Sequence, residues 1–266
     1  MKNITAKQNL KNIQCFLLDM DGTIYLEDYL LPGASAFINH LEDSRIDYLF
    51  LTNNSSKDAA QYIDKLAGFG ISVSRSRIMT SGDATAIYLK KNHPQASLYV
   101  VGTEALQQAF ISDGFTISDT NPDIIVLGFD TTLTYEKLWK SCNFIREGRK
   151  YIATHPDINC PTRDGFMPDI GSFIALIQAS TGREPDVIIG KPFEPMIEAI
   201  ESHTGYTRNE ICMIGDRLYT DIAMGEYGIF TILVLSGEAK EGDIANARVQ
   251  PDIVFEDIGK ALEYLK

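Results

Sequence analysis

A short apolar run ends in two aspartates in the segment Cys15-Phe16-Leu17-Leu18-Asp19-Met20-Asp21-Gly22-Thr23. The run is too short for a helix and stops at a turn signal, so it predicts a buried parallel strand. Open α/β folds bind ligands at the carboxyl ends of such strands, which is where Asp19 and Asp21 lie. Two close carboxylates repel each other unless a cation or a proton intervenes, and Mg²⁺ prefers such oxygen ligands. One carboxylate can also attack an electrophile, whereas the alternative is a solvated turn after a strand.

The composition of the 266-residue chain limits its partners. The chain has 24 Lys and Arg against 36 Asp and Glu, which gives a net charge of −12. This balance argues against a nucleic acid or an anionic membrane as the main partner, but it allows a small phosphorylated ligand. The 4 cysteines are scattered without a Cys-x-x-Cys pair, so neither a zinc site nor a disulfide framework is predicted. We recognise no signal peptide or membrane span in the sequence and expect a cytoplasmic protein.

Strand-like and helix-like patterns alternate along nearly the whole chain, which predicts an α/β fold with a mostly parallel sheet. The middle of the chain, residues 82–182, has strands and helices of its own and is long enough for a separate domain. We therefore expect a discontinuous core of residues 1–81 and 183–266, with an inserted α/β domain between its halves. A domain inserted beside the ligand-binding edge of a sheet is well placed to act as a lid.

Polar residues follow four of the predicted strands. They are Asp19 with Asp21, Thr52 with Asn53, Lys191, and Asp216 with Asp221. Each group has a structural alternative, since Thr52 and Asn53 suit helix caps, Lys191 suits a surface, and the last pair suits a loop and a helix face. All four groups at the carboxyl ends of strands in one sheet are hard to explain by capping, and together they predict a catalytic site.

These residues make the chain resemble the phosphatases of the haloacid dehalogenase (HAD) superfamily. The four motifs of that family match Asp19-Met20-Asp21-Gly22-Thr23, Leu51-Thr52-Asn53, Lys191-Pro192, and Gly215-Asp216 with Asp221. The inserted domain lies between the second and third motifs, and it resembles the large α/β (type C2) cap of the NagD-like and 4-nitrophenylphosphatase-like enzymes of subfamily IIA. The resemblance runs from Ile13 to the C-terminal end. It implies a Rossmann-like three-layer core, with residues 82–182 as the cap domain.

The resemblance also implies roles for the aspartates. Asp19 is the expected nucleophile, which forms an aspartyl-phosphate, and Asp21 is the expected general acid and base. Mg²⁺ is the expected cofactor, held by the carboxylates of Asp19 and Asp216 and by the backbone carbonyl of Asp21. Asp221 is expected to stand behind these ligands and to orient a metal water or Lys191.

The phosphoryl group is expected to be held by three further motif residues. They are the hydroxyl of Thr52, Asn53 and the ammonium group of Lys191. Hydrogen-bond donors and positive charge at these positions face the oxygens on which negative charge develops during phosphoryl transfer.

The cap segment 155–172 is rich in proline, glycine and acidic residues, which predicts a shaped loop and not a regular element. The resemblance implies that a cap loop contacts the leaving group, and the predicted substrate-specificity residues are Asp157, Asn159 and Asp169. The alternative is a solvated connection with a helix N-cap at Asp169 or Ser172. His155 is predicted to be structural, because an aspartate of the first motif already fills the acid–base role.

The expected function is Mg²⁺-dependent hydrolysis of phosphate monoesters of small metabolites. Sugar phosphates, nucleoside monophosphates, phosphoglycolate-like compounds and p-nitrophenyl phosphate are all open. The alternatives are a phosphotransferase or phosphomutase on the same scaffold and a non-catalytic phosphate-binding regulator. A protein that has lost its catalytic activity usually lacks one of the acidic, metal-binding or lysine positions of the motifs, and this sequence has all of them. The oligomeric state is also open, and it includes the homodimer through the cap that the resemblance implies.

Overall fold

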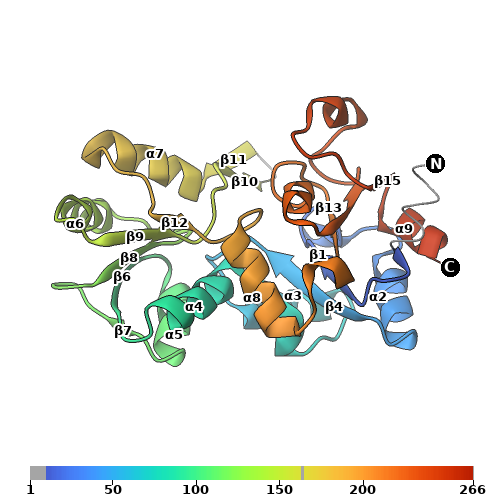
Figure 1. Cartoon of the computed structure of the whole chain (residues 1–266), viewed down its shortest axis with the longest axis horizontal. Helices are drawn as coiled ribbons and strands as arrows, with labels where there is room; N and C mark the ends of the chain where they lie inside the picture. The colour runs from blue at the N-terminus through green and yellow to red at the C-terminus, as the bar shows by residue number, and fades with distance from the viewer. Residues whose placement is uncertain (1–9, 163–164, 266) are drawn as a thin grey trace. The chain divides into compact units, whose positions relative to one another are not determined.

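The computed structural model of the chain describes residues 10–162 and 165–265 (Figure 1). Its contacts divide the chain into two compact units. Unit 1 contains the described parts of Met1–Thr52, Tyr62–Met79 and Ile200–Lys266, and unit 2 contains those of Asn53–Gln61 and Thr80–Ala199. The predicted limits of a catalytic core and a cap, at residues 82 and 183, stay a prediction. Among the described helices, none combines the length and the apolar character needed to cross a membrane.

Unit 1 is built around a six-stranded sheet with the strand order β15-β14-β13-β1-β4-β5. The strands are β1 (Cys15–Leu18), β4 (Asp47–Thr52), β5 (Ile78–Thr80), β13 (Ile211–Gly215), β14 (Phe230–Val234) and β15 (Ile253–Phe255). The central strand β1 pairs in parallel with β4 and with β13, and the register aligns Leu18 with Phe50 and with Ile214. Because the pairing is parallel, these three neighbouring strands end at the same edge of the sheet. The predicted buried strand at residues 15–18 is confirmed.

Helices and a small hairpin complete unit 1 (Figure 1). The elements are the hairpin of β2 (Tyr25–Leu26) and β3 (Tyr29–Leu30), the helices α2 (Ala34–Asp43) and α9 (Ile258–Leu265), and the short 3-10 helices Arg75–Arg77, Arg208–Glu210, Ile222–Tyr227 and Glu241–Asn246. The helix α3 (Ala59–Gly68) begins in unit 2 and belongs to unit 1 from Tyr62 on. The apolar face of α2 packs on β1, where the rings of Phe37 and Phe16 meet edge to face. α2 also packs against α9. This contact is close, because a Cβ atom at Gly33 would lie 2.8 Å from the backbone nitrogen of Gly259.

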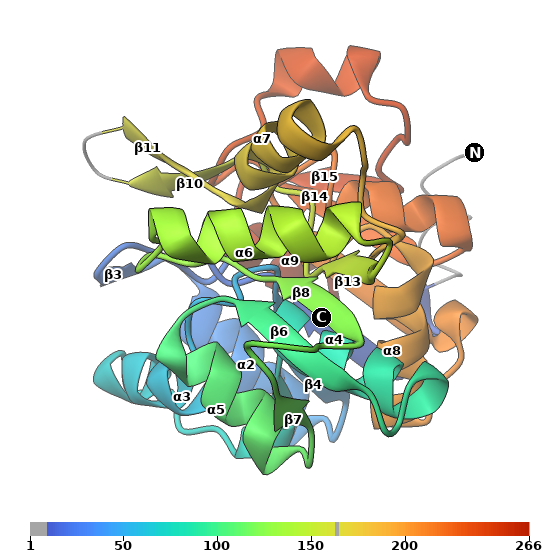
Figure 2. The ribbon, with the colours of Figure 1, turned by 90° about the vertical axis from the view of Figure 1, so that its left-hand side faces the viewer.

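Unit 2 contains a five-stranded sheet with the order β12-β9-β8-β6-β7, and every neighbouring pair is parallel. Its strands are β6 (Ser97–Val101), β7 (Thr116–Ile117), β8 (Ile124–Leu127), β9 (Lys150–Ala153) and β12 (Val187–Ile188). Its helices are α4 (Ser81–Asn92), α5 (Glu104–Ser112), α6 (Tyr135–Arg146) and α7 (Ile170–Thr181), and α8 (Glu194–Thr204) follows at its end. α6 and α7 cover one face of the sheet, and α5 lies on the other (Figure 2). A buried apolar cluster, which includes Tyr99, Leu127 and Tyr151, fills the space under α6 and α7.

The structure corrects two of the expectations. The strand that precedes Lys191 belongs to the five-stranded sheet, where β12 pairs with β9, and not to the sheet of β1. A three-residue apolar run carries no information about which sheet will accept it. The cap segment also contains regular structure, because β10 (Asn159–Thr162) and β11 (Gly165–Pro168) form an antiparallel hairpin. Prolines are tolerated in such a two-stranded ribbon because each strand is an edge. Residues 163–164 of this segment lie outside the described part of the chain.

The α/β class and the mostly parallel sheets are confirmed.

Candidate active site

Three buried aspartates of unit 1 gather at the carboxyl edge of its sheet. Asp19 follows β1 directly and Asp216 follows β13 directly, so the pairing of these two strands brings the aspartates together. The backbone N–H of Asp19 continues the ladder and donates to the carbonyl oxygen of Ile214 at 2.9 Å. Asp221 joins them, and one carboxylate oxygen from each of the three lies within 4.8 Å of the others.

Glycines and backbone N–H groups hold the carboxylate of Asp216 in place. A Cβ atom at Gly22 would stand 2.6 Å from the carboxylate carbon of Asp216, and Gly22 itself has a φ of +88°, which favours glycine. A Cβ atom at Gly237 would stand 2.5 Å from the same carbon. The backbone N–H of Glu238 donates to Oδ2 of Asp216 at 2.7 Å. In the same way, the backbone N–H of Arg217 donates to Oδ2 of Asp221 at 3.1 Å.

The chemistry of this cluster fits a divalent metal ion. Three carboxylates this close together and buried repel one another when they are ionised, and a cation that sits between them removes the repulsion. Hard oxygen donors are the ligands that Mg²⁺ prefers, with waters and substrate oxygens completing its shell. The glycines around Asp216 leave room for its carboxylate at a point where a larger side chain would displace it.

Asp21 lies outside this cluster. About half of its side chain, 51%, is exposed, and Oδ1 is 4.0 Å from Nζ of Lys65. Lys65 in turn lies over the ring of Tyr25, 3.8 Å from the ring centre. Burial raises the pKa of Tyr25 well above its usual value, and the nearby carboxylate of Asp21 adds to the rise. The side chain of Asp21 is therefore exposed and separate from the cluster of buried aspartates, and its acid–base role stays a prediction.

The predicted phosphate-binding residues are divided between the units. Thr52 is the last residue of β4 and is buried at the same sheet edge as Asp19, one strand away. Asn53 and Lys191 both belong to unit 2 and are buried there. Oδ1 of Asn53 accepts the backbone N–H of Lys191 at 2.8 Å, and Nδ2 of Asn53 donates to the carbonyl oxygen of Lys191 at 3.1 Å.

The predicted specificity residues of the cap differ in exposure. Asn159 is exposed on β10. Asp157 is buried and accepts a hydrogen bond from Nδ2 of Asn53 at 3.0 Å. Asp169 is buried as the N-cap of α7, and Oδ1 accepts the backbone N–H of Ile170 at 2.7 Å. The alternative of a helix cap at Asp169 is therefore realised in the structure, and a substrate contact of these three residues stays a prediction.

The sequence reasoning missed the loop that follows β14. Ser236 donates from its hydroxyl to the carbonyl oxygen of Gly22 at 2.7 Å, and Gly237 and Glu238 hold Asp216 as described above. The signal was available, because this loop also begins where a buried apolar strand of the same sheet ends.

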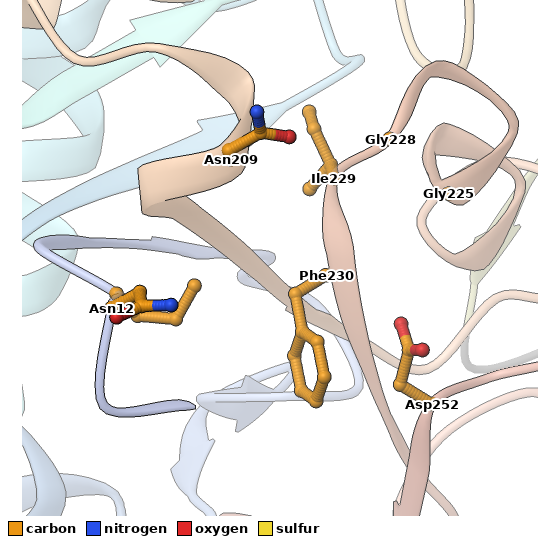
Figure 3. A pocket seen from close by; sticks show the side chains of 8 residues that line it. Asn12, Asn209, Gly225, Gly228, Ile229, Phe230 and Asp252 are labelled. Atoms are coloured by element: carbon orange, nitrogen blue, oxygen red, sulfur yellow. The ribbon is translucent and has the colours of Figure 1, made fainter. Parts of the chain in front are cut away.

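A hollow of about 370 Å³ lies at the opposite edge, where Phe230 begins β14 and Asp252 precedes β15 (Figure 3). It is separate from the aspartate cluster.

Comparison with known proteins identifies the family. A family model described as a haloacid dehalogenase-like hydrolase matches residues 16–116, and one described as HAD-hydrolase-like matches residues 188–261. The acid sugar phosphatase of Staphylococcus epidermidis is 36% identical over 259 residues, which cover 97% of this chain and 100% of that protein. The chain is a haloacid dehalogenase phosphatase.

Further relatives of this HAD phosphatase carry related names. A 5′-nucleotidase of Bacillus subtilis is 35% identical and covers 96% of this chain and 100% of its own length. The crystal structure of a 4-nitrophenylphosphatase from Thermotoga maritima is 44% identical, with a TM-score of 0.94, and the match covers 97% of this chain and 99% of that one. The predicted family and the predicted class, a phosphoric monoester hydrolase, are confirmed.

Proposed function

We propose that this HAD phosphatase hydrolyses phosphate monoesters of small metabolites, with Mg²⁺ and through an aspartyl-phosphate on Asp19. The buried cluster of Asp19, Asp216 and Asp221 is the observation that supports this most strongly. The relatives are named as an acid sugar phosphatase, a 5′-nucleotidase and a 4-nitrophenylphosphatase. We therefore propose sugar phosphates, nucleoside monophosphates, phosphoglycolate-like compounds and p-nitrophenyl phosphate as the substrate class.

The proposed reaction has two halves. In the first, a carboxylate oxygen of Asp19 attacks phosphorus, the bond from phosphorus to the ester oxygen breaks, and Asp21 gives its proton to the leaving alkoxide. In the second, water attacks the phosphorus of the aspartyl-phosphate and Asp21 takes the proton of that water. Inorganic phosphate leaves and both aspartates return to their first state. The exposure of Asp21 outside the buried cluster supports its exchange of protons.

Mg²⁺ would be held by the carboxylates of Asp19 and Asp216 and by the backbone carbonyl of Asp21. Asp221 would orient a metal-bound water or Lys191 without binding the ion directly. When bound, the ion neutralises charge on the phosphoryl oxygens. Thr52 and Lys191 would bind those oxygens through a hydroxyl donor and a positive charge. Asn53 would bind them through its backbone N–H, because both N–H groups of its side-chain amide are donated to Asp157 and to the carbonyl oxygen of Lys191. Thr52 and Asn53 are consecutive in the chain, which supports a shared role at the phosphoryl group.

For recognition of the rest of the substrate we propose the cap, with Asp157, Asn159 and Asp169 as the predicted contacts. Asn159 is the exposed member of this set, whereas the two aspartates are buried and hydrogen-bonded inside unit 2. Asn159 is therefore the first to test. A cytoplasmic location and a homodimer through the cap stay predictions.

The experiment is phosphate release from p-nitrophenyl phosphate by the wild type and by Asp19→Asn, with Mg²⁺ and with EDTA. We expect turnover that needs Mg²⁺ and is lost in Asp19→Asn, with Asp28→Asn, an exposed aspartate in the β2–β3 turn, as the matched control. Folded wild type that releases no phosphate from any ester in a metabolite panel would refute hydrolysis. Transfer of the phosphoryl group to a second metabolite would instead indicate a phosphotransferase, and phosphate binding without any reaction would indicate a regulator.

A further inference from the structure

A chain of buried polar side chains runs through unit 2. Nδ2 of Asn53 donates to Oδ1 of Asp157 at 3.0 Å, and the backbone N–H of Asp157 donates to Nδ1 of His155 at 3.3 Å. On the other side of the ring, Nε2 of His155 lies 3.5 Å from Oδ1 of Asp169. All four side chains are buried. Buried polar groups are costly unless they are paired, so such a connected arrangement fixes the position of each member.

One hydrogen bond assigns the position of the proton on the ring of His155. The backbone N–H of Asp157 can only donate, so Nδ1 of His155 must be the acceptor and carry no proton. In the neutral ring the proton is then on Nε2, which faces the carboxylate of Asp169. The imidazole thus accepts on one side and presents its N–H on the other.

The first turn of α7 holds the loop that carries His155. The backbone N–H of Asp169 donates to the carbonyl oxygen of Ile158 at 2.9 Å, and that of Gly171 donates to the carbonyl oxygen of Asp157 at 2.8 Å. Gly171 is needed for this approach, because a Cβ atom there would lie 2.5 Å from the carbonyl oxygen of Pro156. The position of Asp157 is therefore determined by α7 as well as by His155.

Asp157 determines the orientation of the amide of Asn53. The two ends of an Asn amide are similar in shape, so either end can face a backbone group. A carboxylate accepts only from the NH₂ end, and Asp157 therefore turns Oδ1 of Asn53 toward the backbone N–H of Lys191. Nδ2 of Asn53 also donates to the carbonyl oxygen of Lys191. The amide of Asn53 thus makes two hydrogen bonds to the main chain of Lys191, one to its N–H and one to its carbonyl oxygen.

The main chain at Gly190, just before Lys191, packs closely against His155 and Asn53. A Cβ atom at Gly190 would lie 2.6 Å from Cβ of His155 and 2.7 Å from Oδ1 of Asn53. The backbone N–H of Gly190 donates to the carbonyl oxygen of Thr154 at 2.8 Å. Only a glycine before Lys191 allows its main chain to come this near to both side chains.

We propose that His155, Asp157 and Asp169 are positioning residues of the phosphate-binding site. They hold the amide of Asn53, and through it the main chain of Lys191, in the geometry that binds a phosphoryl group. This rests on the proposed function, in which Asn53 and Lys191 bind that group. This role differs from a direct contact between the two cap aspartates and the rest of the substrate. Residues that position the phosphate-binding site affect the binding of every phosphate ester equally, whereas contacts with the leaving group affect only some esters.

Three variants separate these roles. His155→Leu removes the acceptor at Nδ1, whereas His155→Asn keeps an acceptor on the same side of the residue, and Asp157→Ala removes the partner of Asn53. The dissociation constant of inorganic phosphate is measured by calorimetry in the presence of Mg²⁺, and KM is measured for a panel of phosphate esters. His93→Gln, a half-buried histidine of unit 2 outside the chain of contacts, is the control.

We expect His155→Leu and Asp157→Ala to weaken phosphate binding about tenfold, which is the scale of one lost buried hydrogen bond. KM should rise by the same factor for every ester, and His155→Asn should stay within about threefold of the wild type. An unchanged phosphate affinity in folded His155→Leu would overturn the proposal. So would KM changes that differ from ester to ester while phosphate affinity stays constant, because these indicate contact with the leaving group.

A second measurement does not depend on turnover or on the folding of a variant. Nitrogen NMR of the wild type reports which ring nitrogen of His155 carries the proton. A protonated Nε2 with an unprotonated Nδ1 is expected, and a proton on Nδ1 would overturn the proposed chain of contacts. A wild type that binds phosphate but hydrolyses no ester would refute the proposed function, while the phosphate affinities of the variants would still decide this inference.

Discussion

Gly237 lies so close to Asp216 that a Cβ atom on it would stand 2.5 Å from the carboxylate carbon. Real Cβ atoms do not come this near to another heavy atom, so any side chain at position 237 has to push the carboxylate away. The loop after β14 therefore helps to determine the geometry of a carboxylate that follows β13, the neighbouring strand of the same sheet.

Gly237→Ala should therefore damage the proposed metal site. Displacement of a catalytic carboxylate by about 1 Å can cost roughly 10²-fold in rate, and we expect a loss of that order in Mg²⁺-dependent hydrolysis. The measurement is a Mg²⁺ titration of p-nitrophenyl phosphate hydrolysis together with a thermal melt. Gly242→Ala is the matched control, since a Cβ atom there meets nothing within 4 Å. Equal activity in the two variants would contradict a tight fit around Asp216.

Asp21→Asn should slow turnover while leaving the cluster of buried aspartates intact. The amide cannot supply or accept a proton in the way a carboxyl group does, and loss of general acid–base catalysis costs about 10²–10⁴-fold. The rate of hydrolysis should fall more for alkyl phosphates than for p-nitrophenyl phosphate, because an alkoxide leaving group depends more on protonation than a nitrophenolate does. The rates of both ester types are compared with those of Asp28→Asn. An equal loss for both would argue against Asp21 as the acid.

Mg²⁺ should stabilise the folded protein. A ligand present at one hundred times its dissociation constant contributes about 2.7 kcal/mol, which corresponds to a rise in melting temperature of about 5 °C for a chain of this size. Asp216→Asn removes a charge from the cluster and should abolish the rise, whereas Asp28→Asn should retain it. A melting temperature of the wild type that does not respond to Mg²⁺ would count against the cluster as a metal site.

Ser55→Ala should destabilise unit 2 by about 1–3 kcal/mol, because it leaves a buried N–H group without its acceptor. The hydroxyl of Ser55 is buried, accepts the backbone N–H of Phe129 at 2.9 Å and lies 2.9 Å from the hydroxyl of Thr154. The neighbouring Ser56→Ala, which loses a half-exposed contact with Asn54, should change stability by less than about 0.5 kcal/mol. Urea unfolding of both variants provides the test, and similar midpoints would show that the Ser55 contacts do not stabilise the unit.

Stability should fall in acid in part through Asp47. The hydrogen bond from the hydroxyl of Tyr206, at 2.6 Å, lowers the pKa of Asp47, and Arg77 at 2.9 Å adds to this effect. A carboxyl group with a lowered pKa in the folded state stabilises the protein above its unfolded-state pKa, near 4, and this stabilisation is lost as the pH falls through the folded-state pKa.

Tyr206→Phe should therefore flatten the acid side of the stability profile. Because Asp47 is partly exposed, the loss at neutral pH should stay below about 1 kcal/mol. The melting temperature is followed from pH 7 down to about pH 3, across the unfolded-state pKa of an aspartate. Tyr29→Phe, an exposed tyrosine, serves as the control. A profile as steep as that of the wild type would exclude the Tyr206 hydrogen bond as the cause.

The aspartate cluster was predictable because its geometry follows from strand pairing. Asp19 and Asp216 each come directly after an apolar run, and parallel strands that pair in register end together. The place of Lys191 was not predictable, since the short run before it pairs with β9 of the five-stranded sheet and not with a strand of the sheet of β1. Periodicity reports that a segment is apolar and not which neighbour it will meet.

The contacts of His155 could not be predicted from the sequence either. That histidine was predicted to be structural, and its burial agrees with this, but its partners depend on how the loop of residues 155–158 meets the first turn of α7. Asp169 illustrates the same difficulty, because one acidic residue in a loop suits both a substrate contact and a helix cap. Only the fold shows that its carboxylate accepts the backbone N–H of Ile170.

The central position of β1 also has a consequence for how the chain folds as it is synthesised. One edge of β1 pairs with β4, which emerges soon afterwards, but the other pairs with β13, where Cys15 meets Ile211. Until the last part of the chain leaves the ribosome, this second edge has no partner and offers its backbone groups to other chains. The strands of the five-stranded sheet lie within residues 97–188 and can assemble earlier. We expect the catalytic sheet to be the last part of the enzyme to form.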